Sequence, residues 1–171
     1  MNRRTFLVAG GLSTLGVMAG SAVYRVRSVW WDQETAGDYQ MLSRREAEIA
    51  EAMADAMFPG DNRGMPNGTE VAVVETFDDY LAAINPHTAN LLRLLLHTID
   101  EMAVVSGLSM TRFHRRPRQE RIDILNAWDT SKIGVRREVF QGLKIIFAMG
   151  YCESPAVIRA AGIDYECGAW R

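Results

Sequence analysis

Histidine and acidic side chains are the first candidates for chemistry in this chain of 171 residues, which carries three histidines, His87, His97 and His114. His97 and Asp100 stand three positions apart within a helical pattern, a spacing that places both on one side of a helix. Such a pair could relay a proton, or could bind a metal ion together with a further ligand. No Glu-x-x-His and no His-Glu-x-x-His motif occurs, so the pattern favours a histidine that serves packing in the core or at its rim.

Other patterns of catalytic or cofactor-binding residues do not occur in the sequence. It has no Gly-x-Ser-x-Gly elbow, no phosphate-binding Gly-x-x-x-x-Gly-Lys-Ser/Thr loop and no Cys-x-x-Cys-His haem motif. Gly10 and Gly11 do not begin a dinucleotide-binding Gly-x-Gly-x-x-Gly fingerprint, because Leu12 follows them. We therefore predict no catalytic, cofactor-binding or metal-binding residue on this chain.

The N-terminal residues are similar to the twin-arginine export signal of bacteria. Arg3 and Arg4 are followed by one variable residue, by Phe6 and Leu7, and by an uncharged stretch that is rich in glycine and alanine. We interpret residues 1–22 as a signal peptide that is cleaved after Ala22; the alternative is an uncleaved membrane anchor. The twin-arginine route is known for carrying folded proteins. The chain is therefore expected to reach the periplasm folded, with a cofactor of its own or with a partner that holds one.

The two cysteines, Cys152 and Cys167, are candidates for a disulfide in an oxidising compartment. A bridge that closes a loop of this length would contribute about 3 kcal/mol in the chain-entropy model. Either cysteine could instead bond to a partner or stay free, and the internal bridge is the favoured reading.

Residues 23–42 are interpreted as a linker. It contains Trp30 and Trp31, which are expected at a membrane surface, on a partner or packed on the chain's own domain. The helical domain is predicted over residues 43–163, and residues 164–171 form a C-terminal tail.

Apolar residues at three- and four-residue spacing predict helices throughout this domain. Ser43 and Glu46 form a capping box at the start of the first helix, and Thr69 is expected to cap the second. The Leu-rich helix from Pro86 to Gly107 is expected to be the central, buried one. Further helices are predicted near residues 117–128, 135–150 and 155–161, and no strand pattern is found. The predicted fold is therefore a single all-α bundle of five or six helices.

The charge balance argues against a nucleic-acid-binding protein. Nineteen basic residues stand against 21 acidic ones, which gives a formal net charge of −2. The basic run at residues 113–118 is interpreted as a solvated loop or as a contact with an acidic partner, with Arg115 and Arg116 as candidate contact residues. The polar segment from Asp61 to Gly68 lacks the spacing of a calcium loop and is interpreted as a solvated connection.

Two segments resemble the gluconate 2-dehydrogenase subunit 3 family, the small subunits of periplasmic flavin dehydrogenases. The first is Leu42-Ser43-Arg44-Arg45-Glu46-Ala47-Glu48-Ile49, and its helix ends at Met57-Phe58-Pro59-Gly60-Asp61. The second is Val71-Ala72-Val73-Val74-Glu75-Thr76-Phe77-Asp78-Asp79-Tyr80-Leu81. The resemblance covers residues 42–163, and residues 150–155 match the family pattern only loosely.

The resemblance implies that this chain binds a partner subunit and does not itself carry a catalytic site. In such complexes FAD is carried by a large subunit similar to glucose–methanol–choline oxidoreductases, and a cytochrome c subunit often accepts the electrons. The small subunit supplies the export signal and stabilises the flavoprotein, in a complex that can associate peripherally with the membrane. The alternative is a stand-alone exported helical protein that binds a metal ion or another ligand through His97, Asp100 and other groups.

Overall fold

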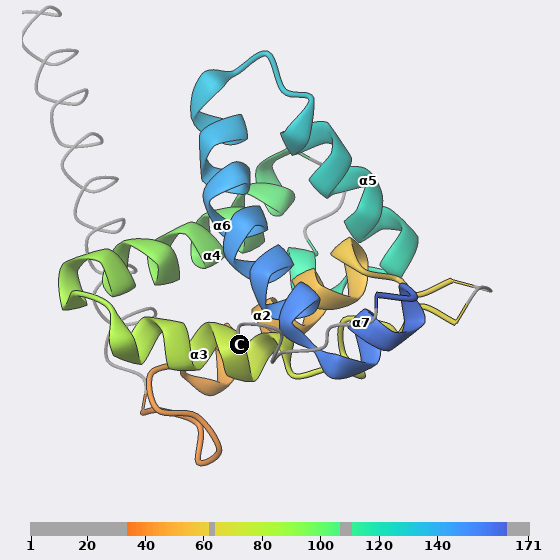
Figure 1. Cartoon of the computed structure of the whole chain (residues 1–171). Coiled ribbons are helices and arrows are strands. Elements are labelled where there is room, and N and C mark those ends of the chain that lie inside the picture. The colour runs from red at the N-terminus through yellow and green to blue at the C-terminus, as the bar shows by residue number, and fades with distance from the viewer. Residues whose placement is uncertain (1–33, 62–63, 107–110, 164–171) are drawn as a thin grey trace, which may run out of the picture. The chain divides into compact units, whose positions relative to one another are not determined.

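The computed structural model describes residues 34–61, 64–106 and 111–163. Within these ranges the chain forms six α-helices and one 3₁₀ turn, so the prediction of an all-α bundle is confirmed. The elements are α2 (Arg44–Met57), α3 (Val73–Ala83), α4 (Pro86–Ser106), η2 (Phe113–Arg115), α5 (Arg118–Asp129), α6 (Gly134–Glu153) and α7 (Pro155–Ala160) (Figure 1). Arg3, Arg4, Phe6, Leu7, Trp30, Trp31 and Cys167 lie outside the described residues.

Helix α2, rather than α4, is the most deeply buried helix among the described residues. Nine of its side chains are buried, most of them alanines that let neighbouring helices approach closely. It contacts α3, α4, α5 and η2 (Figure 1). On α4, Leu96 and Ile99 are buried but Leu91 is about half exposed, so the expectation of a central α4 was wrong. The many apolar residues of α4 indicated that the helix is partly buried, but they did not indicate that α2 is buried more deeply.

The start of α2 is fixed by two sets of hydrogen bonds. The predicted capping box is present, with the Ser43 hydroxyl accepting from the Glu46 amide and Glu46 accepting from the Ser43 amide. The carboxylate of Asp78 on α3 accepts the backbone amides of Gln40, Met41 and Leu42 at 2.6–2.9 Å. Leu42 is fully buried, so the packed domain begins before Ser43, within the segment interpreted as linker.

The start of α3 differs from the prediction at Thr69. The helix begins at Val73, its N-cap residue is Ala72, and no side chain caps it. Thr69 instead donates through its amide and hydroxyl to Oδ1 of Asn67, both at 2.9 Å. The cap at Thr69 was therefore wrong, because the hydroxyl is held by Asn67 in the turn that precedes the helix.

None of the helices in the described part of the chain combines the length and apolar character needed to cross a membrane.

Candidate functional site

His97 and Asp100, the pair with the spacing for chemistry, are both buried on α4 but bind different partners. His97 is 2% exposed and its Nε2 donates to Oε1 of Glu46 at 3.1 Å. Asp100 is fully buried, and its hydrogen bonds come from His114 and from Arg45 of α2. The two residues therefore belong to neighbouring ion-pair clusters where α2, α4 and η2 meet.

The first group, which we call the Glu46 cluster, consists of Glu46, Ser43, Arg93 and His97. Arg93 makes a two-pronged contact, in which Nε and one terminal nitrogen each donate to a different carboxylate oxygen at 2.9 Å. The Ser43 amide and hydroxyl donate to Oε2 at 2.9 and 2.8 Å. A buried carboxylate with this many donors is held in one orientation, and the paired guanidinium compensates its charge.

The second group, the Asp100 cluster, consists of Asp100, Arg45, Glu101, Arg112 and His114. Nδ1 of His114 donates to Asp100 at 2.7 Å, and a terminal nitrogen of Arg45 donates to Asp100 at 3.0 Å and to Glu101 at 2.8 Å. Arg115 donates to the other ring nitrogen of His114 at 3.3 Å, an arrangement that places the ring proton on Nδ1. Glu101 also pairs with Arg112 at 3.5 Å.

A third acidic group, Asp55 on α2, joins three segments that are distant in sequence. Its carboxylate accepts from Asn67 at 3.0 Å, from Nε of Arg118 at 3.0 Å and from Arg121 at 2.6 Å. The loop that contains Asn67 and the first turn of α5 are therefore both attached to α2. Asn67 is itself buried, so this part of the loop is not the solvated connection that the sequence suggested.

The electrostatics of these carboxylates favour permanent ion pairs over proton transfer. Burial by itself raises the pKa of Glu46, but hydrogen bonds from His97, Arg93 and Ser43 outweigh it and lower the pKa to about 2. The pKa of Asp100 is likewise lowered, because bonds from His114 and Arg45 outweigh its burial. A general base that works near neutral pH needs a pKa near 7, which is the opposite direction. The two clusters therefore fix the positions of α2, α4 and η2 relative to one another.

Within the described residues, no group of three or more His, Cys, Asp or Glu side chains could hold a metal ion.

We expect the Glu46 cluster to make the free energy of unfolding depend on pH in the acidic range. Because the folded pKa of Glu46 lies below its ordinary value of 4.5, its contribution is complete above that pH and disappears as the pH falls toward 2. The difference between these pKa values corresponds to about 3 kcal/mol. Urea unfolding of the wild type and of Glu46→Gln at several pH values measures it. The stability gap between the two proteins should shrink by this amount on acidification; a gap that is constant with pH would contradict the assignment.

The basic run is divided between the interior and the surface. Arg116 has only 8% of its side chain exposed, and it donates to the carbonyl oxygens of Thr111 and Ala103 and to Glu120. Arg115 is exposed. The interpretation as a solvated loop therefore fits Arg115 but not Arg116 or His114, whereas a contact of either arginine with a partner stays a prediction.

Cys152 lies exposed on α6 and is a free thiol in the described part of the chain. Since Cys167 falls in the C-terminal tail, outside the described residues, their pairing stays a prediction.

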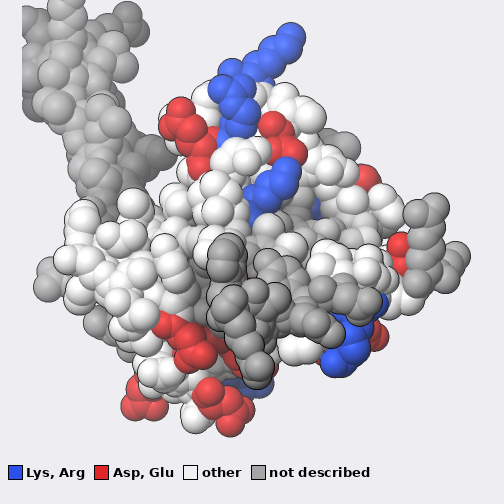
Figure 2. All heavy atoms as spheres, in the orientation of Figure 1, with Lys and Arg blue, Asp and Glu red and all other residues white. Residues whose placement is uncertain are grey.

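Exposed apolar side chains, which the helical spacing in the sequence does not reveal, lie along α6. Val135, Ile145 and Met149 are 70%, 59% and 53% exposed, and the helical repeat places them within an arc of about 80°. We call these three residues the outer α6 face. Figure 2 shows a broad uncharged area over α4, whereas charged side chains lie over the first turns of α6. The sequence could have predicted these exposed residues, because α6 contains more apolar residues than a single buried face of a helix can accommodate.

No protein-family model, curated protein or solved structure matches the chain.

Proposed function

We propose that this chain is a non-catalytic accessory subunit of an exported FAD-dependent dehydrogenase similar to gluconate 2-dehydrogenase. In this proposal it supplies the twin-arginine signal, travels folded with a flavoprotein of the glucose–methanol–choline type, and stabilises that partner in the periplasm. A cytochrome c subunit completes the complex at the membrane surface. The redox chemistry belongs to the partner.

The observation that supports this proposal best is the contrast between the interior and the surface. Three side chains of the types needed for chemistry, His97, Asp100 and Glu46, are engaged in buried ion pairs between elements, whereas His87 is exposed at the start of α4. The outer α6 face instead exposes three large apolar side chains, with the exposed Glu138 among them, and apolar side chains grouped on one exposed helix face are typical of a subunit interface. The basis in the sequence is the arrangement of Arg3, Arg4, Phe6 and Leu7.

Co-purification from the periplasm with an affinity tag on this chain tests the proposal. We expect a flavoprotein to co-purify, and we expect Arg3→Lys together with Arg4→Lys to leave most of that flavoprotein in the cytoplasm. The control is the same strain with the unmodified signal. Normal export of the flavoprotein with the double variant, or a tagged chain that purifies alone, would contradict the proposal.

The outer α6 face can be tested separately. Replacing Ile145 by Asp should weaken the complex by about 30-fold or more, because a charge would be buried in an apolar interface. Ala127→Asp, at an exposed position on α5, introduces the same charge away from this face and should leave the complex unchanged. Equal effects of the two substitutions would place the interface elsewhere.

A further inference from the structure

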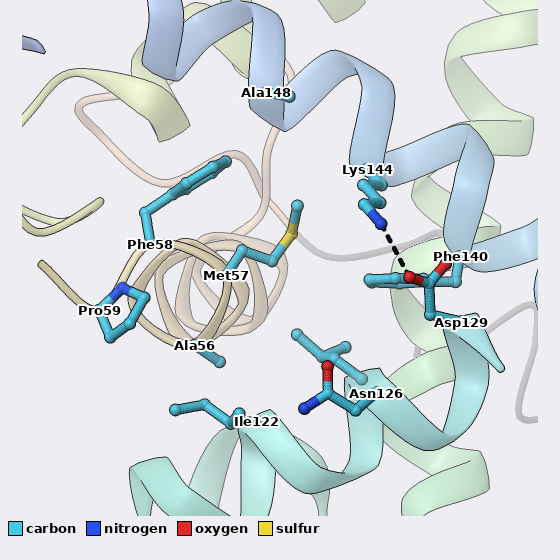
Figure 3. Close-up of a pocket in the computed structure, with 11 residues that line it drawn as sticks. Ala56, Met57, Phe58, Pro59, Ile122, Asn126, Asp129, Phe140, Lys144 and Ala148 are labelled. Atoms are coloured by element: carbon cyan, nitrogen blue, oxygen red, sulfur yellow. Dashed lines mark hydrogen bonds and ion pairs between the residues drawn. The ribbon is translucent and has the colours of Figure 1, made fainter. Parts of the chain in front are cut away.

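A cavity of about 340 Å³ opens between the end of α2, α5 and α6 (Figure 3). Most of its wall is apolar, and its lining comprises Ala56, Met57, Phe58, Pro59, Ile122, Leu125, Asn126, Asp129, Phe140, Lys144 and Ala148. Figure 3 shows Asn126, Asp129 and Lys144 on one side of the space, with Phe58 and Pro59 on the opposite side. An apolar cavity with a few polar groups gathered at one end is the usual form of a small-molecule site.

The apolar wall is held in place by contacts outside the cavity. The ring of Phe58 stacks on that of Tyr151, with centroids 4.1 Å apart and planes 4° from parallel. The Tyr151 hydroxyl donates to the carbonyl of Pro66 at 2.7 Å, and the Phe58 carbonyl accepts the amide of Gly68 at 2.8 Å. Because Phe58 is fixed on both its ring and its backbone, the space is preformed rather than opened by a ligand.

The polar end is electrically balanced. The Lys144 ammonium donates to Oδ2 of Asp129 at 2.8 Å and lies 5.5 Å from the centroid of the Phe140 ring. Gln141 donates to the other oxygen of Asp129. Lys144 has further N–H donors, and the Asn126 amide supplies two more. The end of the cavity therefore offers donors to a ligand without offering an uncompensated charge.

We propose that this cavity binds a neutral small molecule with an apolar body of one or two rings and a carbonyl oxygen that accepts hydrogen bonds from Lys144 and Asn126. The volume is near the lower end of the range of about 300–1,000 Å³ for ligand pockets, which sets the size of the molecule. An anionic ligand is disfavoured, because the Lys144 charge is already paired with Asp129 and no uncompensated positive charge lies at this end of the cavity. This inference does not depend on the proposed function.

The test uses the full chain and prodan, a neutral naphthyl ketone whose fluorescence moves to shorter wavelength in an apolar site. We expect saturable binding with one probe per chain, and amide chemical-shift changes in the wild type centred on Phe58, Ile122 and Lys144. Ala148→Phe fills the space and should weaken binding about tenfold or more. Lys144→Met keeps the apolar stem but removes the donors, and should also weaken binding by about tenfold.

The controls separate this cavity from other apolar surfaces. Lys132→Met removes an exposed charge in the connection between α5 and α6 and should leave prodan affinity unchanged. The anionic probe anilinonaphthalene sulfonate should bind more weakly than prodan. Prodan binding that survives in both Ala148→Phe and Lys144→Met, or shift changes confined to the outer α6 face, would overturn the proposal. The chemical-shift measurement uses only the wild type, so it still tests where prodan binds if Ala148→Phe fails to fold.

Discussion

Replacing Glu46 by alanine should lower the free energy of unfolding by about 3–5 kcal/mol, the range for breaking a buried ion pair by removal of one partner. The carboxylate is 1% exposed and receives bonds from Ser43, Arg93 and His97. Without it, the guanidinium of Arg93 stays largely buried opposite no negative charge, and the capping box of α2 is lost. Urea unfolding near neutral pH measures this difference in stability.

Glu48 provides the matched control, because it lies on the same helix and pairs with Arg44 at the surface. Glu48→Ala should change the stability by less than about 1 kcal/mol, since both side chains of this pair are largely exposed. Arg93→Met should cost less than Glu46→Ala, because other donors to Glu46 remain. If Glu46→Ala costs no more than Glu48→Ala, the Glu46 cluster does not organise the bundle.

The helices and, apart from that of α3, their starts could be predicted because their signals are local. Ser43 and Glu46 are three residues apart, and the capping box they predict is the one observed. Pro86 and Pro155 mark the first turns of α4 and α7, where a missing amide proton is tolerated. Thr69 shows where local reasoning fails: Asn67, two residues earlier, competes for the hydroxyl that was expected to cap α3.

The ion-pair clusters could not be predicted, because their members are far apart in the sequence. Glu46 meets His97 across 51 positions, and Asp55 meets Arg118 across 63. The spacing of His97 and Asp100 correctly predicts that both lie on α4 and face the interior of the protein. It cannot reveal that Asp100 accepts hydrogen bonds from Arg45 and His114. A run such as residues 113–118 is similarly ambiguous, since its total charge does not say which side chain turns inward.

The placement of charge also connects the fold to the proposed function. Glu46, Asp55 and Asp100 have lowered pKa values because each accepts several hydrogen bonds, most of them from side chains of other elements, and these outweigh the effect of burial. Groups of this kind hold helices in register and do not exchange protons near neutral pH. Besides charged residues such as Arg137 and Glu138, α6 exposes the apolar side chains of the outer α6 face, a property that fits the proposal that the chain works through a partner.

Replacing Gly68 by alanine is expected to destabilise the fold by about 3 kcal/mol or more, at the upper end of the cost of overpacking. A Cβ atom at this position would collide with the backbone carbonyl of Ala54 on α2, which cannot move aside as a flexible side chain could. The substitution would therefore push the loop away from α2 and weaken the bond between Asn67 and Asp55. Thermal and urea unfolding measure the loss.

Gly37→Ala is the control for this substitution, because nothing lies within 4 Å of a Cβ there and the backbone is not left-handed. It should leave stability within about 0.5 kcal/mol of the wild type. The Gly68 amide also donates to the carbonyl of Phe58, which forms a wall of the cavity. Gly68→Ala should therefore weaken prodan binding even at temperatures where the variant is folded, whereas Gly37→Ala should not. Unchanged stability and unchanged probe affinity in Gly68→Ala would show that the loop does not need this close approach to α2.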